Sequence, residues 1–71
     1  MANEARRVDT PAALYRARKS LGMTQAELAD ALRLSRNGER TVRRWEKGEI
    51  PISGPAQIAV EWLLKDSGAD Q

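Results

Sequence analysis

Four basic side chains recur at helical spacing near the middle of this chain: Arg40, Arg43, Arg44 and Lys47. At about 100° per residue they share one arc of a helix, whereas Val42 and Trp45 share the opposite arc. Guanidinium and ammonium groups bind phosphate oxygens, and arginine also pairs with guanine through two hydrogen bonds. A helix with such a basic arc fits the major groove of duplex DNA, which is about 12 Å wide.

The basic residues are concentrated in one part of the sequence. Residues 16–47 carry nine basic and four acidic side chains, a net charge of +5, whereas the remaining three basic and six acidic side chains give −3. The whole chain of 71 residues has a formal charge of +2 and an isoelectric point near 9.5. Such segregation is typical of a polyanion-binding surface, although charge alone fits an ordinary solvated surface equally well.

The chain contains neither cysteine nor histidine. This excludes a disulfide framework, zinc sites built on thiolates or imidazoles, and catalysis by Ser/His/Asp or Cys/His groups. No two acidic residues have the spacing of an acid–base catalytic pair, so we expect no enzyme activity, no metal and no cofactor. No run approaches the ~18 apolar residues of a membrane span and no leader opens the chain, so a cytoplasmic binding protein without membrane contact is expected.

The composition is dominated by helix-forming residues. Residues typical of helix starts and ends delimit four predicted helices. Thr10 followed by Pro11 is typical of a helix start, and Ser53 or Gly54 caps the last helix. The sequence Thr24-Gln25-Ala26-Glu27 is a capping box, in which the outer two side chains bond free backbone N–H groups. We expect helices from after residue 10 to 22, from 24 to 32 or 33, from about 39 to 48, and from 53 or 54 to 68.

The predicted helices form one small all-α domain over residues 10–67, with a flexible arm at 1–9 and a tail at 68–71. In the first helix Arg18 lies in an otherwise apolar stripe, and in the third Glu46 borders another. Either charge alone would be costly to bury, so we predict that the two residues form an ion pair. Its role would be structural, because it ties the first helix to the end of the third.

The fourth helix is apolar on more than one face. Ile58, Ala59 and Trp62 suit the core, and both tryptophans lie in apolar arcs, which favours packing over stacking on single strands. A second apolar surface predicts a two-fold homodimer that holds two basic helices about one duplex turn, roughly 34 Å, apart. Its predicted contacts are Ala56, Val60, Leu63 and Leu64. The alternative is a helix that is central to the core of a monomer.

Two motifs in the span from Leu14 to Leu64 resemble the helix-turn-helix domain of the Cro and phage-repressor type, also called the xenobiotic-response-element-like family. They are Arg18…Leu21-Gly22-Met23-Thr24-Gln25-Ala26-Glu27-Leu28-Ala29 and Thr41-Val42-Arg43-Arg44-Trp45-Glu46-Lys47-Gly48. The resemblance implies a lambda-repressor-like fold of four to five short helices, with the third in the major groove and the second across the phosphate backbone. It also implies that Arg18 and Glu46 form the buried ion pair of the family.

The chain departs from this family after the second helix. Arg33 stands where the family usually has glycine, and the span from Ser35 to Trp45 is about three residues longer, near Asn37-Gly38-Glu39. We predict a longer turn, with the reversal of the backbone moved from residue 33 to Gly38.

The predicted contacts with DNA divide into bases and phosphates. Arg40 and Arg44 point out from the middle of the third helix and are expected to read bases, whereas Arg43 and Lys47 bind phosphates. Glu39 either accepts a hydrogen bond from cytosine or stabilises the start of the helix.

Three further residues flank this helix. Arg36 and Asn37 are expected on the loop before it, where they face the groove or its flanking phosphates, although Asn37 also suits a left-handed turn. Gln25 resembles the phosphate-contacting glutamine of the family, at a helix start that attracts anions.

Together these features predict a sequence-specific regulator that binds double-stranded DNA at a palindromic operator. We expect a repressor that blocks the promoter of its own short operon, in a phage or mobile element as the resemblance suggests. The alternative is a protein-interaction adaptor whose basic helix docks on an acidic partner. RNA binding is disfavoured because the chain lacks exposed aromatic stacking signatures.

Overall fold

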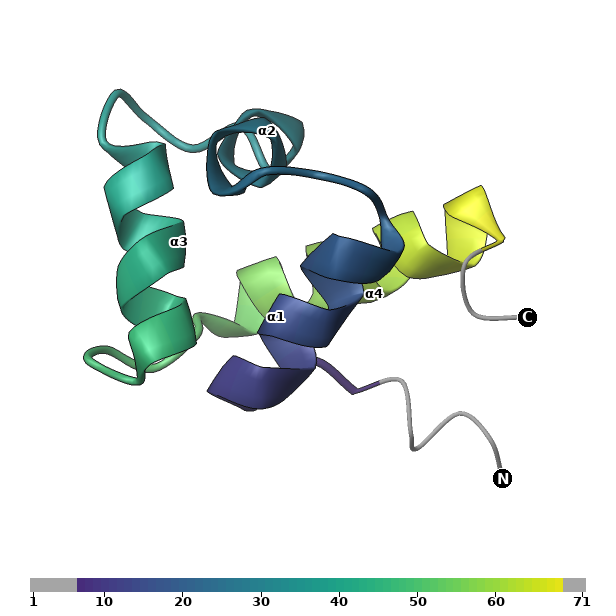
Figure 1. The fold of residues 1–71 in the computed structure, drawn as a ribbon, viewed down its shortest axis with the longest axis horizontal. Helices are drawn as coiled ribbons and strands as arrows, with labels where there is room; N and C mark the ends of the chain where they lie inside the picture. Colours follow the sequence, from purple (N-terminus) through teal and green to yellow (C-terminus); the bar gives the residue numbers. More distant parts are fainter. Residues whose placement is uncertain (1–6, 69–71) are drawn as a thin grey trace.

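The computed structural model describes residues 7–68, and this part of the chain consists of four helices without a strand. They are α1 (Pro11–Ser20), α2 (Gln25–Ala31), α3 (Gly38–Lys47) and α4 (Gly54–Ser67) (Figure 1). The expected all-α fold with four helices is therefore confirmed.

The helix starts follow from the capping residues. The Thr10 hydroxyl accepts a hydrogen bond from the Ala13 amide at 3.1 Å, and Ser53 caps α4 in the same way through the Ala56 amide. Both bonds of the predicted capping box are present between Thr24 and Glu27, at 2.9 and 3.1 Å. Helix α3 begins one residue before the predicted start, and Asn37 makes no side-chain cap bond there.

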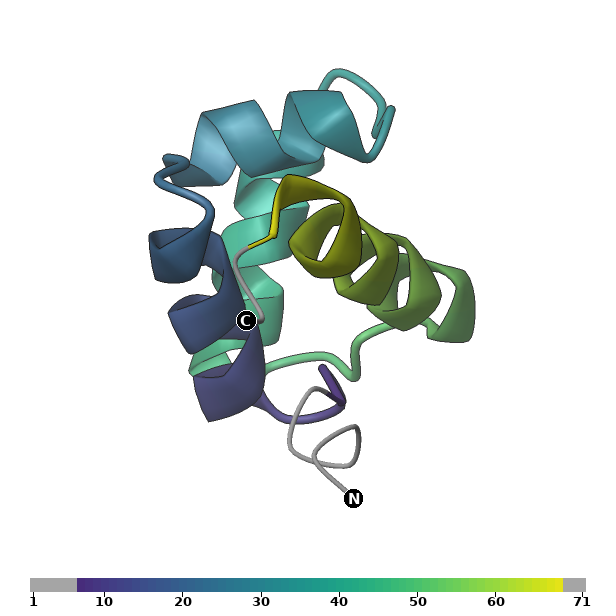
Figure 2. The same ribbon diagram turned by 90° about the vertical axis from the view of Figure 1, so that its right-hand side faces the viewer.

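The core lies among the four helices, and α1 and α3 each pack on two of the others. Helix α2 packs on α3, and α1 packs on both α3 and α4 (Figures 1 and 2). The buried apolar residues of the first three helices face this core: Leu14, Ala17, Leu28, Ala29, Val42 and Trp45. Burying a leucine or valine side chain stabilises the fold by about 1.5–3 kcal/mol. Burial of Val42 and Trp45 therefore holds α3 against the core.

The folded domain begins earlier than the sequence indicated. Val8 is 1% exposed and belongs to the core, and its amide donates to Glu61 Oε2 of α4 at 3.0 Å. The predicted flexible arm over residues 1–9 is thus wrong at Val8, while residues 1–6 and 69–71 lie outside the described part. One apolar residue in an extended segment shows no periodicity, which is why the pattern missed it.

The two faces of α4 are the reverse of those predicted. Ala56, Val60 and Leu64 recur every fourth residue on the buried side, so the dimer contacts predicted at these three positions are wrong. Leu63 is partly buried and packs against the same core. Ile58 and Trp62 were predicted in the core but are 57% and 63% exposed. A helix that is apolar on most sides has no clear periodic signal, and the rotation of α4 is set by packing against α1 and Val8.

The reversal between α2 and α3 also differs from the prediction. Arg33 itself adopts the left-handed conformation, at φ +59°, whereas Gly38 does not. Gly38 is needed for close packing, because a Cβ atom there would lie 2.7 Å from the Leu34 Cβ and 2.9 Å from the Ala29 Cβ. The backbone therefore reverses at Arg33, and Gly38 allows α3 to approach α2 closely.

Replacing Arg33 with glycine is expected to stabilise the protein. A residue with a side chain is strained by roughly 1 kcal/mol in the left-handed region, and glycine removes this strain. Glycine also raises the entropy of the unfolded chain, so the net gain in stability is smaller than the strain removed. We expect Arg33→Gly to raise the melting temperature by about 2–6 °C, measured by circular dichroism. The control is Arg36→Gly in the same loop, which has no positive φ and should not be stabilised. Equal shifts in both variants would contradict this account.

Candidate nucleic-acid interface

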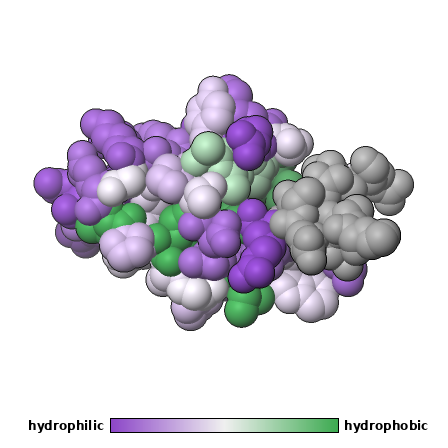
Figure 3. All heavy atoms as spheres, turned by 90° about the horizontal axis from the view of Figure 1, so that it is seen from below, coloured by the Kyte–Doolittle hydropathy of each residue, from purple (hydrophilic) through white to green (hydrophobic). Residues whose placement is uncertain are grey.

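Helix α3 presents its basic residues on the surface opposite its buried side. We call Arg40, Arg43, Arg44 and Lys47 the basic ridge; all four are exposed, and with Glu49 they line one shallow hollow. Figure 3 shows hydrophilic side chains covering the end of the molecule formed by α3, at the left of that view. The predicted division of α3 into an apolar and a basic face is therefore confirmed.

Two of the ridge arginines have acidic neighbours. Arg43 Nη2 lies 3.4 Å from Glu39 Oε2, and Arg44 Nε lies 3.3 Å from Glu49 Oε1. Within residues 7–68, Arg40 and Lys47 have no ion-pair partner. Ion pairs this exposed contribute only about 0–1 kcal/mol, and neither pair removes its arginine from the surface that a polyanion would meet.

A buried ion pair fixes the ridge relative to α1. Arg18 donates from Nε and Nη2 to the two carboxylate oxygens of Glu46 at 2.7 and 3.0 Å, and the two side chains are 10% and 8% exposed. Arg18 Nη1 also donates to the Met23 carbonyl at 3.0 Å. The hydrogen bond to Glu46 raises the pKa of Arg18, against desolvation, which lowers it. The predicted pair is thus confirmed, in bidentate form.

Gln25 joins this network from the start of α2. Its Nε2 donates to Glu46 Oε1 at 3.2 Å, so Glu46 on α3 holds side chains from both α1 and α2. The sequence predicted Gln25 as a phosphate contact but gave no sign of this bond. The network sets the angle between α2 and α3, the two helices that a duplex would meet.

The loop before α3 exposes Arg36 and Asn37, as predicted. The Asn37 carbonyl accepts from the amide and the hydroxyl of Thr41, at 3.1 and 3.2 Å, while no side-chain bond of Asn37 caps the helix. Both residues come just before the ridge in the sequence. The Glu39 carboxylate forms an ion pair with Arg43.

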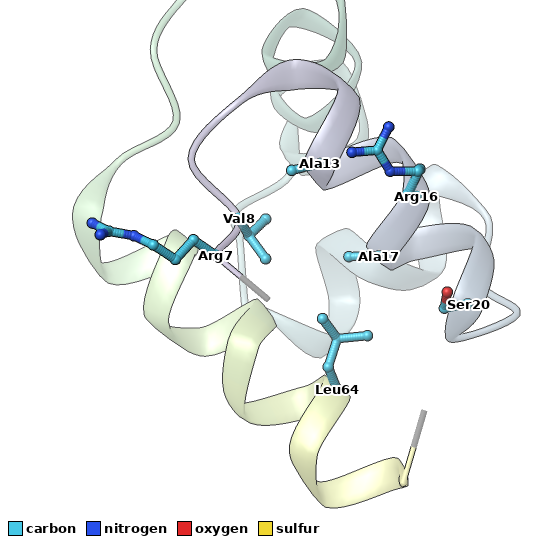
Figure 4. A pocket seen from close by; sticks show the side chains of 7 residues that line it. All are labelled: Arg7, Val8, Ala13, Arg16, Ala17, Ser20 and Leu64. Carbon is cyan, nitrogen blue, oxygen red and sulfur yellow. The ribbon is translucent and has the colours of Figure 1, made fainter. Parts of the chain in front are cut away.

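Not every basic residue of the positive segment belongs to the ridge. Arg16 on α1 lines a different hollow with Arg7 and Ser20, between the N-terminal segment, α1 and α4 (Figure 4). Val8 and Leu64 point into that space from opposite sides in this view. The nine basic residues counted over residues 16–47 therefore lie on at least two separate surfaces of the molecule.

The described residues contain no helix long and apolar enough to cross a membrane. They also contain no group of three or more carboxylates that could hold a metal ion.

Comparison with known proteins gives one family and two curated relatives. The helix-turn-helix family matches residues 14–56. The type II methyltransferase M1.ScrFI of Lactococcus lactis subsp. cremoris is 50% identical over 48 residues, which are 68% of this chain and 12% of that protein. The type II methyltransferase M.SsoII of Shigella sonnei is 56% identical over 43 residues, which are 61% of this chain and 11% of that protein. No solved structure matches the chain.

The chain thus spans about a tenth of the length of the methyltransferases that it resembles. The family match covers α1 from Leu14 onward, all of α2 and α3, and the start of α4. It therefore includes the ion-pair network and the whole basic ridge. By its fold and by this match, the chain belongs to the helix-turn-helix family of the Cro and phage-repressor type, whose members bind DNA.

Proposed function

We propose that this protein is a cytoplasmic, sequence-specific repressor that places α3 in the major groove of double-stranded DNA and blocks the promoter of its own short operon. A phage or another mobile element is the setting proposed for that operon. Arg40 and Arg44 read bases in this proposal, Arg43 and Lys47 bind phosphates, and the protein performs no catalysis.

The observation that carries the proposal is the basic ridge. Its four cations stand on two turns of a helix whose other side is buried through Val42 and Trp45. A rigid helix with outward arginines loses little conformational entropy when it docks, and its diameter suits the major groove. Exposed Arg36 and Asn37 and half-buried Gln25 are proposed as the contacts to the neighbouring backbone, with Glu39 beside them at the start of α3.

A salt titration tests this proposal against the protein-adaptor alternative. Duplexes selected from a random library with the protein provide the probe, and binding is followed by fluorescence anisotropy. If each subunit neutralises about five or six phosphates, log K falls against log salt with a slope near −5 per subunit. A protein that binds no duplex at low salt, or binds selected and scrambled duplexes alike, is not a sequence-specific regulator. Footprinting upstream of its own gene then tests autorepression.

A second candidate function is favoured by the two relatives, both of which are type II methyltransferases. The chain would then be a DNA-binding segment that serves such an enzyme. A footprint on the target sequence of a methyltransferase encoded beside it, rather than on a promoter, would favour this second candidate.

The repressor is proposed to bind a palindromic operator as a homodimer. Exposed Ile58 and Trp62 lie one turn apart on α4 and line a shallow hollow with Glu61 and Lys65. The Lys65 ammonium lies 5.4 Å from the Trp62 ring centroid. An apolar pair flanked by an acid and a base can match a second copy of itself about a two-fold axis, so this face of α4 is the proposed dimer interface.

Trp62→Lys is expected to convert the protein to a monomer without loss of fold. The side chain is 63% exposed, so its replacement should change the melting temperature by little. Sedimentation at micromolar concentration is expected to show a dimer for the wild type and a monomer for the variant. Tyr15→Lys, at an exposed aromatic residue on α1, is the matched control and should remain dimeric. A wild type that stays monomeric both free and on DNA would remove the dimer.

A further inference from the structure

Glu49 is an acidic residue placed at the edge of the basic ridge. Its carboxylate lines the same hollow as the four ridge cations, and its Oε1 lies 3.3 Å from Arg44 Nε. The two side chains are about half exposed, so both can meet a ligand on this surface. An acid beside a set of cations that attract phosphates weakens that attraction, so its position there needs an explanation.

The backbone holds Glu49 in place against Arg44. Helix α3 ends at Gly48 in the left-handed conformation, at φ +77°, and the chain folds back over the last turn. The Glu49 amide then donates to the Arg44 carbonyl at 2.9 Å. Residues 44 and 49 are thus joined twice, once through the backbone and once through the side chains.

This second bond restricts how the arginine can bind. A guanidinium group has five N–H donors, and the carboxylate of Glu49 takes the one on Nε. The two terminal nitrogens remain free and form the end-on edge that can donate to two acceptors of one guanine. A restrained arginine also loses less rotamer freedom when it binds, whereas a free one can turn toward either a base or a phosphate.

We propose that Glu49 is a specificity-determining residue of the DNA interface, which positions the Arg44 guanidinium for base contact and disfavours binding through phosphates alone. The inference rests on the proposed function of the ridge. Non-specific binding is almost entirely electrostatic, so a negative charge near the phosphates weakens it on every duplex. On the correct sequence, the preoriented bidentate contact offsets this repulsion, and the ratio between the two affinities rises.

The test compares three variants on two duplexes, one selected from a random library by the wild type and one scrambled. Glu49→Gln removes the charge and is expected to bind the scrambled duplex about fivefold more tightly, the effect of one nearby charge in water. Its preference for the selected duplex is expected to fall about tenfold, and repeated selection should show one relaxed base pair. Glu49→Asp keeps the charge but shortens the reach to Arg44, so it should relax the same base pair without tightening scrambled binding.

Asp30→Asn is the matched control, because it removes an equal charge from an exposed position on α2, outside the hollow that the ridge lines. It should leave the selected base preferences intact. If Asp30→Asn and Glu49→Gln relax the same preferences equally, or if Glu49→Asp selects as the wild type does, Glu49 does not position Arg44. If the wild type itself has no preference among duplexes, the proposed function fails first, and that outcome is seen before any variant is made.

Discussion

Glu46→Gln is expected to lower the free energy of unfolding by about 3–5 kcal/mol, the loss typical of breaking a buried ion pair. The substitution leaves the Arg18 side chain, which is only 10% exposed, without its counter-charge, and it weakens the bond to Gln25. A domain of this size has a total stability of only about 4–11 kcal/mol. Thermal melting by circular dichroism should therefore drop by at least about 12 °C, and urea unfolding should give the energy directly.

Two comparisons separate this effect from a general loss of charge. Glu39→Gln breaks the exposed pair with Arg43 and should change the stability by less than about 0.5 kcal/mol. Combining Arg18→Met with Glu46→Leu removes both charges, and it should recover much of what Glu46→Gln loses. If Glu46→Gln melts within a degree or two of the wild type, the pair does not hold α1 against α3.

The sequence predicted those parts of the fold that depend on neighbours along the chain. Caps, such as the box at Thr24, act within a single turn, and the arcs of α3 are unambiguous because its polar side carries full charges. The Arg18–Glu46 pair was predictable for a related reason, since an isolated charge in an apolar stripe requires a partner. These features could be predicted because the local sequence pattern and the tertiary structure favour the same arrangement.

What the sequence did not reveal depends on contacts between distant segments. The rotation of α4 follows from packing against Val8 and α1, and an all-round apolar pattern such as that of Ile58 to Leu64 does not encode it. The left-handed Arg33 was missed because glycine is the usual residue there, and Gly38 drew the prediction instead. Glu49 was missed as part of the site because only the left-handed turn at Gly48 brings it back onto α3.

The largest expected effect on binding concerns the ridge itself. Arg44→Ala is expected to cost about 1–3 kcal/mol on a selected duplex and to relax the preference at one base pair, because it removes a bidentate contact. Lys47→Ala should weaken selected and scrambled duplexes alike and reduce the salt slope by about one, as expected for a phosphate contact. Both side chains are exposed and alanine favours helices, so the melting temperatures should remain near that of the wild type.

Arg16→Ala gives the matched control, since it removes an equally exposed cation from the hollow between α1 and α4. If overall charge drives binding, Arg16→Ala should weaken it as much as Lys47→Ala does. If the ridge drives binding, Arg16→Ala should leave both duplexes almost unchanged, while replacing all four ridge cations with alanine abolishes sequence preference. Equal losses on selected and scrambled duplexes for Arg44→Ala would instead make Arg44 a phosphate contact, and base reading by α3 would then have to come from Arg40.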